Sequence, residues 1–159
     1  MLDKKVNKML YYNNILDEDI YSLDDVKNPI SALNENKVFV DRKIDKIIKE
    51  GDISIFINVK SDAPYTDGNR VSSLYNTLTI EVGVICHKSC RKTLNGIREL
   101  IVTDRIKEIL TTDVNLHCIG DLVIKSSSPM YSIPYYDYNG YSTVFEIIYW
   151  KDMYNNEIS

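Results

Sequence analysis

Alternating apolar and polar residues in two stretches of the chain constrain its fold more than any other feature. In residues 53–59 and again in residues 77–86, every second residue is apolar. Successive side chains of a β-strand point to opposite faces of a sheet, so each stretch predicts a strand with one face against a core. The apolar positions are Ile53, Ile55, Ile57 and Val59 in the first stretch and Leu78, Ile80, Val82, Val84 and Cys86 in the second.

The segment between these two strands, residues 61–76, is polar and contains the turn-forming sequence Asp67-Gly68-Asn69. It is too long for a tight hairpin turn, and its composition is typical of surface loops. We therefore expect a mobile loop between the two strands.

Two further strands are expected near the C-terminus, in residues 121–127 and 141–150. A tyrosine-rich connection separates them, and its Asn139-Gly140 pair is a turn signal. The last strand is apolar on both faces, because Val144, Ile148 and Trp150 alternate with a second apolar set. This pattern predicts burial on both sides, by the helix of the domain on one face and by something else on the other.

Helical spacing appears first in residues 2–16 and 41–51. In the first segment Leu2, Val6, Met9 and Leu10 recur at spacings of three and four residues, which places them on one face of an amphipathic helix. The second segment begins at Asp41, a good helix cap, and ends at Gly51, a favoured stop. Both segments therefore predict helices.

Residues 89–110 predict the longest helix, although Gly96 within it costs about 1 kcal/mol relative to alanine. Residues 17–36 fit either a loop or a second short helix. Residues 38–40, two valines around a phenylalanine, fit an extended segment.

The order of these elements is helix, helix, strand, strand, helix, strand, strand, without regular βαβ alternation. It predicts an α+β fold: a four-stranded, mostly antiparallel sheet packed against one main helix, with helices at the N-terminus. A chain of 159 residues fits a single domain, residues 1–159. Within it we expect a helical N-terminal region, residues 1–50, and a sheet-and-helix core, residues 51–159.

Composition excludes several classes of function. A net charge of −4 argues against a broad surface that grips nucleic acid phosphates, and Lys88, Arg91 and Lys92 are more simply a solvated face. No apolar run approaches the roughly 20 residues of a membrane span, and the N-terminus lacks the apolar core of a signal peptide. Three cysteines do not resemble a secreted disulfide framework, so we expect a reducing compartment and no membrane association.

The strongest candidate for chemistry is a zinc site, because cysteine and histidine occur together at two places in the chain. The residues are Cys86, His87, Cys90, His117 and Cys118. Buried thiols that act as small apolar side chains are the favoured interpretation. Since no nucleophile motif or phosphate-binding loop is present either, we expect no catalytic residues, no cofactor, no metal and no enzyme activity.

Tyrosine is the unusual residue, with twelve in the chain, and many of them crowd the connection between the last two strands. Tyrosine combines rigid apolar area with a polar tip and is enriched at protein interfaces. The alternative interpretations are that the rings cover the end of the sheet or that they stack on nucleic acid bases. Together with the loop, the cluster supplies the candidate protein contacts Pro64, Tyr65, Asp67, Tyr131, Tyr135, Tyr136 and Tyr138.

The strand-to-helix unit of residues 78–87 and 91–110, followed by residues 119–125 and 141–151, resembles phage tail-terminator and tail-completion proteins of Gram-positive phages. The resemblance begins at residue 53 and covers about two thirds of the chain, so residues 1–50 depart from it. It consists of element order and hydrophobic pattern.

The resemblance implies a structural protein of the virion neck, assembled in the host cytoplasm. Copies of it would form a ring, typically a hexamer, that caps the tail tube and meets the head connector proteins. DNA would pass through the lumen without specific binding. The alternatives are a small intracellular protein-binding module and another ring subunit of the neck or tail.

Overall fold

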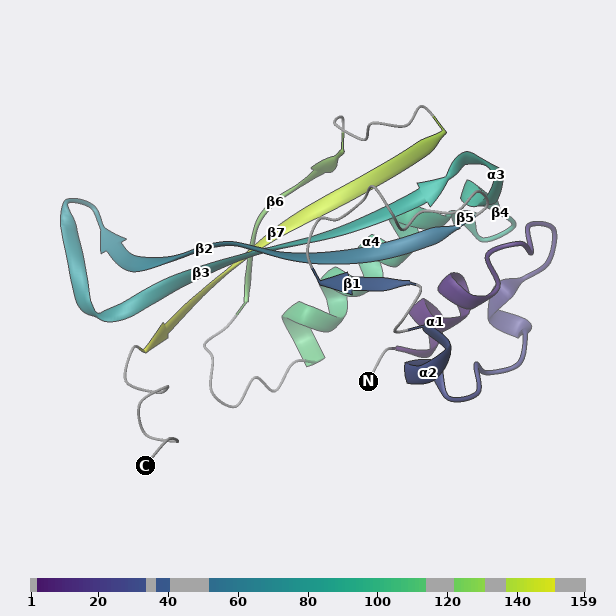
Figure 1. Ribbon diagram of the computed structural model, residues 1–159, viewed down its shortest axis with the longest axis horizontal. Helices are drawn as coiled ribbons and strands as arrows, with labels where there is room; N and C mark the ends of the chain where they lie inside the picture. Colours follow the sequence, from purple (N-terminus) through teal and green to yellow (C-terminus); the bar gives the residue numbers. More distant parts are fainter. Residues whose placement is uncertain (1–2, 34–36, 41–51, 114–121, 131–136, 151–159) are drawn as a thin grey trace.

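The computed structural model describes residues 3–33, 37–40, 52–113, 122–130 and 137–150. Its centre is a five-stranded sheet with the strand order β1-β2-β3-β7-β6 (Figure 1). Strand β1 is parallel to β2, and all other neighbours are antiparallel. The strands are β1 (Val38–Val40), β2 (Ile53–Asp67), β3 (Arg70–His87), β6 (Val123–Pro129) and β7 (Tyr138–Trp150).

The predicted α+β class and mostly antiparallel sheet are confirmed, but the number of strands was wrong. The fifth strand is β1, which pairs with Ile55, Phe56 and Ile57 of β2. Three residues are too few to show a strand period in a sequence, so only the pairing in three dimensions identifies them as a strand.

The predicted loop at residues 61–76 was also wrong, because β2 and β3 remain paired as far as Asp67 and Arg70. Gly68 and Asn69 form the two-residue turn, and Gly68 has a φ of +59°. Positive φ at the first turn residue is the conformation that glycine supplies in a tight hairpin. Segment length had suggested a loop, but most of that length is strand.

The helices gather at one end of the sheet. They are α1 (Lys4–Tyr11), η1 (Ile20–Ser22), α2 (Pro29–Leu33), α3 (Lys88–Arg91) and α4 (Arg98–Glu108), the last continued by a π-helical turn (Ile109–Asp113). Asp3 caps α1 by accepting hydrogen bonds from the backbone N–H groups of Lys5 and Val6. The helix predicted at residues 41–51 lies outside the described residues.

The single helix predicted at residues 89–110 was wrong. A short hairpin, β4 (Lys92–Thr93) and β5 (Gly96–Ile97), separates α3 from α4. Gly96 has a φ of +125°, a conformation that no helix contains and that other residues rarely adopt. Leu94, which the helical pattern placed in a buried stripe, lies exposed in the turn of this hairpin.

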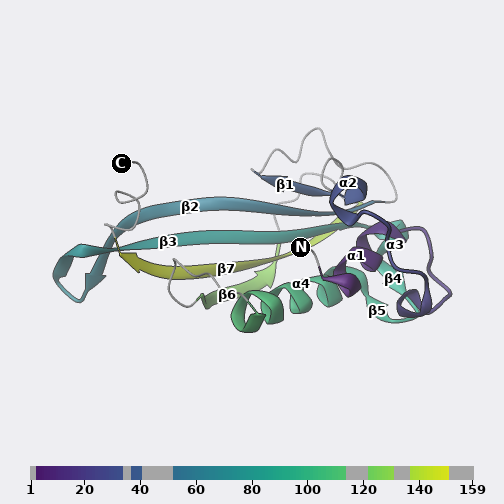
Figure 2. The ribbon, with the colours of Figure 1, turned by 90° about the horizontal axis from the view of Figure 1, so that it is seen from below.

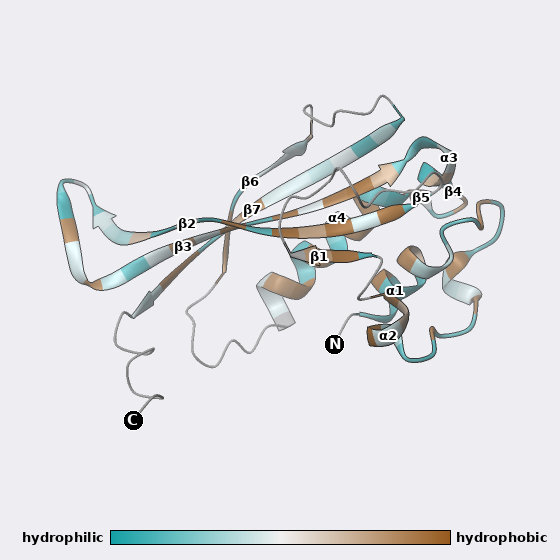
Figure 3. Cartoon of the chain, in the orientation of Figure 1, coloured by the Kyte–Doolittle hydropathy of each residue, from teal (hydrophilic) through white to brown (hydrophobic). Residues whose placement is uncertain are grey.

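The hydrophobic core lies between the helices and one face of the inner sheet. Figure 2 shows α4 along the sheet, with β2 and β3 extending well beyond it. In Figure 3 the hydrophobic residues of these two strands gather in the half beside the helices. The core contains Val6, Met9 and Leu10 of α1, Ile53 and Ile55 of β2, Val82, Val84 and Cys86 of β3, Val102 of α4 and Phe145 of β7.

One buried arginine holds the N-terminal segment against α4. Arg98 has no exposed side-chain surface, and its Nε donates to the backbone oxygen of Cys90 at 2.8 Å. Its Nη1 donates to the oxygens of Met9 and Tyr12 at 2.7 and 3.2 Å. Its Nη2 donates to the oxygen of Ile15 at 2.9 Å. The guanidinium thus satisfies carbonyl groups at the C-terminal end of α1, where a helix terminates with unpaired acceptors.

Candidate functional site

The outer part of the β2–β3 hairpin is the most distinctive surface of the molecule. We call residues 61–76 the arm; it projects beyond the helices in Figure 1. Most of its residues are exposed, including Pro64 and Asp67, whereas Tyr65 is half-buried. A two-stranded ribbon in water is marginally stable by itself, so the arm depends on contacts at its base and on whatever binds it.

A polar cluster fixes the base of the arm to β7. The hydroxyl of Tyr149 donates to the Asp62 carboxylate, whose oxygens lie 2.7 and 2.8 Å away. The amide nitrogen of Asn76 donates to the same carboxylate and to the Tyr149 hydroxyl, each at 3.2 Å. Beside this cluster the rings of Tyr75 and Trp150 lie with centroids 5.1 Å apart. These contacts give the start of the arm a defined direction.

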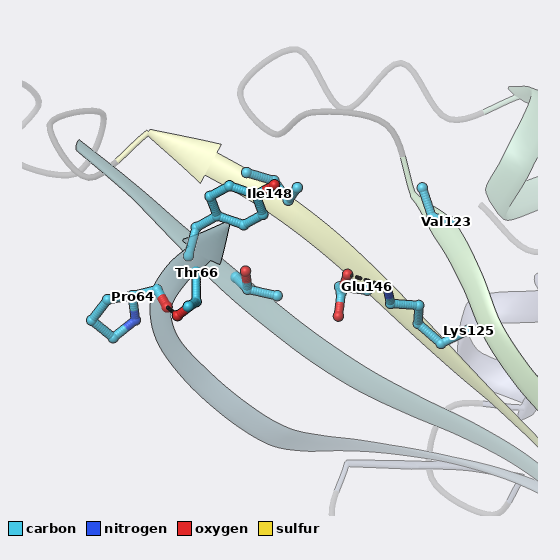
Figure 4. Close-up of a pocket in the computed structure, with 8 residues that line it drawn as sticks. Pro64, Thr66, Val123, Lys125, Glu146 and Ile148 are labelled. Carbon is cyan, nitrogen blue, oxygen red and sulfur yellow. Dashed lines mark hydrogen bonds and ion pairs between the residues drawn. The ribbon is translucent and has the colours of Figure 1, made fainter. Parts of the chain in front are cut away.

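A groove of about 760 Å³ lies between the arm and the outer strands (Figure 4). An ion pair crosses its floor, where Lys125 of β6 and Glu146 of β7 lie 2.7 Å apart. The groove is lined by Pro64, Tyr65, Thr66, Thr77, Val123, Lys125, Glu146 and Ile148. The lining mixes apolar side chains with two threonines and one charge of each sign, a combination suited to a protein segment.

Exposed apolar side chains concentrate on the arm and the outer strands, and two of them, Val123 and Ile148, line the groove. Of the ten large hydrophobic residues exposed in the described part of the chain, seven lie on β2 and β3 beyond the core or on β6 and β7. They are Val59, Val71, Leu74, Val123, Ile124, Ile148 and Trp150. Grouped apolar exposure of this kind marks an interaction surface more often than isolated exposed residues do.

The structure brings together only some of the candidate contacts. Pro64 and Tyr65 line the groove, and Asp67 lies next to the turn of the arm. Tyr138 lies at the opposite end of β7, where its ring packs edge-on against His87 at a centroid distance of 4.9 Å. Tyr131, Tyr135 and Tyr136 lie outside the described residues.

Sequence reasoning missed the part of the groove that β6 and β7 supply. Nothing in the sequence singled out Val123, Lys125 and Glu146, because they are not part of a regular alternation of apolar residues. Ile148 and Trp150 did carry a signal, because they made the second face of the last strand apolar. Both side chains are partly exposed, Ile148 in the groove and Trp150 beside the Tyr75 ring, so the outer half of that face is only partly covered by the described residues.

The candidate zinc residues do not converge in the part of the chain that the structure describes. Cys86 and Cys90 are both buried, with their sulfur atoms 3.5 Å apart. The His87 ring instead forms a hydrogen bond of 2.6 Å with the Ser89 hydroxyl. Residues 117–118 lie outside the described ranges. Within those ranges no three His, Cys, Asp or Glu side chains are grouped to hold a metal ion.

The two thiols shift each other's protonation. The hydrogen bond from Cys86, helped by the positive charge of Arg98, lowers the pKa of Cys90 to about 7. The same hydrogen bond, together with burial, raises the pKa of Cys86. Both sulfur atoms are enclosed by the core, so the pair has no access to a substrate in this conformation.

No helix in the described ranges is long and apolar enough to cross a membrane. No curated protein matches the sequence. The profile of the YomW family, a phage-derived family, matches residues 3–147, which include the helices, the sheet and the arm. The chain therefore belongs to the YomW family.

Proposed function

We propose that this protein is a structural subunit of the phage neck, a tail terminator that forms a ring of identical copies. In this role the ring caps the tail tube and joins it to the head connector. The arm is the observation that carries the proposal. The phage origin of the family agrees with it.

The exposed apolar residues of the arm favour its burial in an assembly. Residues 61–76 form a two-stranded ribbon that buries almost no apolar surface within the single chain. Exposed apolar residues such as Val71 and Leu74 lie on this ribbon, where water opposes their exposure. Burial against another protein would remove this cost, and a ring subunit has neighbours on both sides.

Charge supports a lumen through which DNA slides without being held. Two of the three clustered basic residues are already paired in the described structure: Lys88 with Asp137, and Arg91 with Glu99. The chain as a whole has a net charge of −4. A net negative charge disfavours tight binding to phosphate groups.

The test is to add the purified protein to isolated tail tubes and image them by negative stain. The proposal predicts a ring-shaped cap at one end of each tube. A variant with a shortened arm, in which Asn-Gly replaces residues 64–76, should fold but not cap. The matched control Asn69→Gly changes the turn alone and should cap like the wild type. Uncapped tubes with the wild-type protein would contradict the proposal.

The groove favours a second candidate function, a small module that binds one partner protein. Its volume of about 760 Å³ and its ion-paired floor fit a short segment of another chain. A stable monomer that leaves tail tubes uncapped would favour this function.

A further inference from the structure

The sheet ends in two unpaired edges on opposite sides. On one side β6 pairs only with β7 among the described residues. On the other side β1 covers only residues 55–57 of β2, so the outer edge from Asn58 onward has no strand partner in the described ranges. Unpaired edges present rows of free N–H and C=O groups, which are templates for pairing with another chain.

We propose that these two edges pair with each other between copies, β6 of one copy with residues 58–63 of β2 in the next. This inference rests on the proposed function, because it describes how the ring subunits join. The contact is head-to-tail, so each copy uses two different surfaces. Contacts of this type produce closed rings or open filaments of identical subunits.

Strand direction favours this contact. From β2 to β6 the sheet passes through three antiparallel neighbours, so β6 runs opposite to β2. A second copy placed beside the first in the same orientation therefore brings β2 antiparallel to β6. Antiparallel pairing is the more stable kind, and equal orientation of all copies is what a ring around a single axis requires.

Both edges also contain an irregularity at a matching place. The register of β2 shifts between Val59 and Ser61, and that of β6 shifts between Ile124 and Ser126. The residue at each shift is a lysine that pairs with a glutamate on the same face of the sheet, Lys60 with Glu81 and Lys125 with Glu146. The two bulges therefore face the same way and can lie opposite each other.

One register between β6 of one copy and β2 of the next places the two bulges opposite each other and keeps paired residues on the same face along the whole contact. It sets Ala63 opposite Val123, and Ser61 opposite Lys125 at the bulge. Residues beyond the bulge then also meet on the same face, with Asn58 opposite Ser128. Within one copy a row of paired residues crosses the sheet from Ser61 to Thr79, then to Glu146 and finally to Val123. The next copy is thus displaced by two residues, about 7 Å, along the strands.

Pro64 explains why the paired segment ends where it does. Proline has no N–H group to donate to a ladder, so pairing along the arm is interrupted at this residue. The remaining arm then extends past the end of β6, free to lie against the surface of the neighbouring copy. Val123, 55% exposed in the single chain, becomes covered by Ala63 at the junction.

The test is a disulfide between copies in the variant Ala63→Cys/Val123→Cys, made in a Cys118→Ser background. Within one copy these positions are separated by three strand spacings, about 14 Å, and by a further two residues along the strands, so they cannot form a bridge internally. Mild oxidation should produce a ladder of linked oligomers that a reductant collapses. The control Ala63→Cys/Ile124→Cys moves one thiol to the opposite face and should give at least tenfold less product.

The outcomes separate this inference from the proposed function. A ladder from the first variant and little from the control supports the edge pairing. Rings of normal mass without the ladder, in a variant whose circular dichroism matches the wild type, overturn the edge pairing while the ring remains. A monomer at every concentration without any ladder overturns both.

Discussion

Replacing Arg98 with methionine tests how the N-terminal segment is attached to the rest of the domain. The guanidinium is fully buried, and its hydrogen-bond partners in the described structure are backbone oxygens of Met9, Tyr12, Ile15 and Cys90. Burial lowers the pKa of this guanidinium, but an arginine keeps its charge at any ordinary pH. The residue is therefore a charged donor whose removal leaves several acceptors without a partner.

The size of the effect follows from those contacts. Four hydrogen bonds from a charged donor, at about 1.5 kcal/mol each, amount to about 6 kcal/mol. Removing the charge from the interior relieves a desolvation cost of several kcal/mol, which offsets about half of that loss. We expect Arg98→Met to lower the free energy of unfolding by about 3 kcal/mol, a large fraction of the total for a domain of this size.

Urea unfolding followed by circular dichroism measures this loss, and hydrogen exchange of peptides from α1 locates it. Exchange in α1 should accelerate more than exchange in β3. Arg98→Lys should be intermediate, because a compact ammonium cannot reach all four oxygens. The exposed control Lys92→Met should change the free energy by less than about 0.5 kcal/mol. A loss below about 1 kcal/mol for Arg98→Met, or unchanged exchange in α1, would show that Arg98 does not hold the N-terminal segment in place.

Three further substitutions test other parts of the account. Gly83→Ala would put a Cβ atom 2.1 Å from the Phe56 ring, so thermal melts should show a loss of about 1–3 kcal/mol. Adding Phe56→Leu should recover part of it, and additive losses would contradict the contact. Gly96→Ala should destabilise by about 1–2 kcal/mol because of the positive φ, whereas a helix there would be stabilised. A hydrogen bond from Arg105 holds the pKa of Asp3 below its usual value, so this pair stabilises the fold above about pH 4. Asp3→Asn should therefore lose up to about 1 kcal/mol at pH 7, and the difference from wild type should vanish as the pH falls below the folded-state pKa; a constant difference would exclude the ion pair.

The inner half of the sheet was predictable from sequence because the face of β2 and β3 that packs against the helices is apolar at every second residue. Ile53 and Val84 follow the strand period for that reason. The arm was not predictable because water covers both of its faces, so no alternation records the strands. The sequence did indicate a turn at Gly68, but only the pairing of the residues on either side of it shows that this turn closes a hairpin.

The error at residues 89–110 has a different cause. Apolar spacing of three and four occurs there by chance around a hairpin, and Gly96 supplied the only warning. The candidate site was half predictable. Pro64 and Tyr65 were named from a segment thought to be a loop, and they do line the groove. The opposite wall comes from β6, whose exposed residues follow no period, so only the strand order brings Val123 and Lys125 to this place.

Assembly of identical copies into a closed ring can be read from the mass of the protein in solution. Light scattering across a range of protein concentrations, with negative-stain imaging of the largest species, supplies the measurement. The account predicts a species of about six copies that images as a ring and that the shortened-arm variant does not form. A wild-type protein that stays monomeric at every concentration, even when mixed with isolated tail tubes, would contradict it.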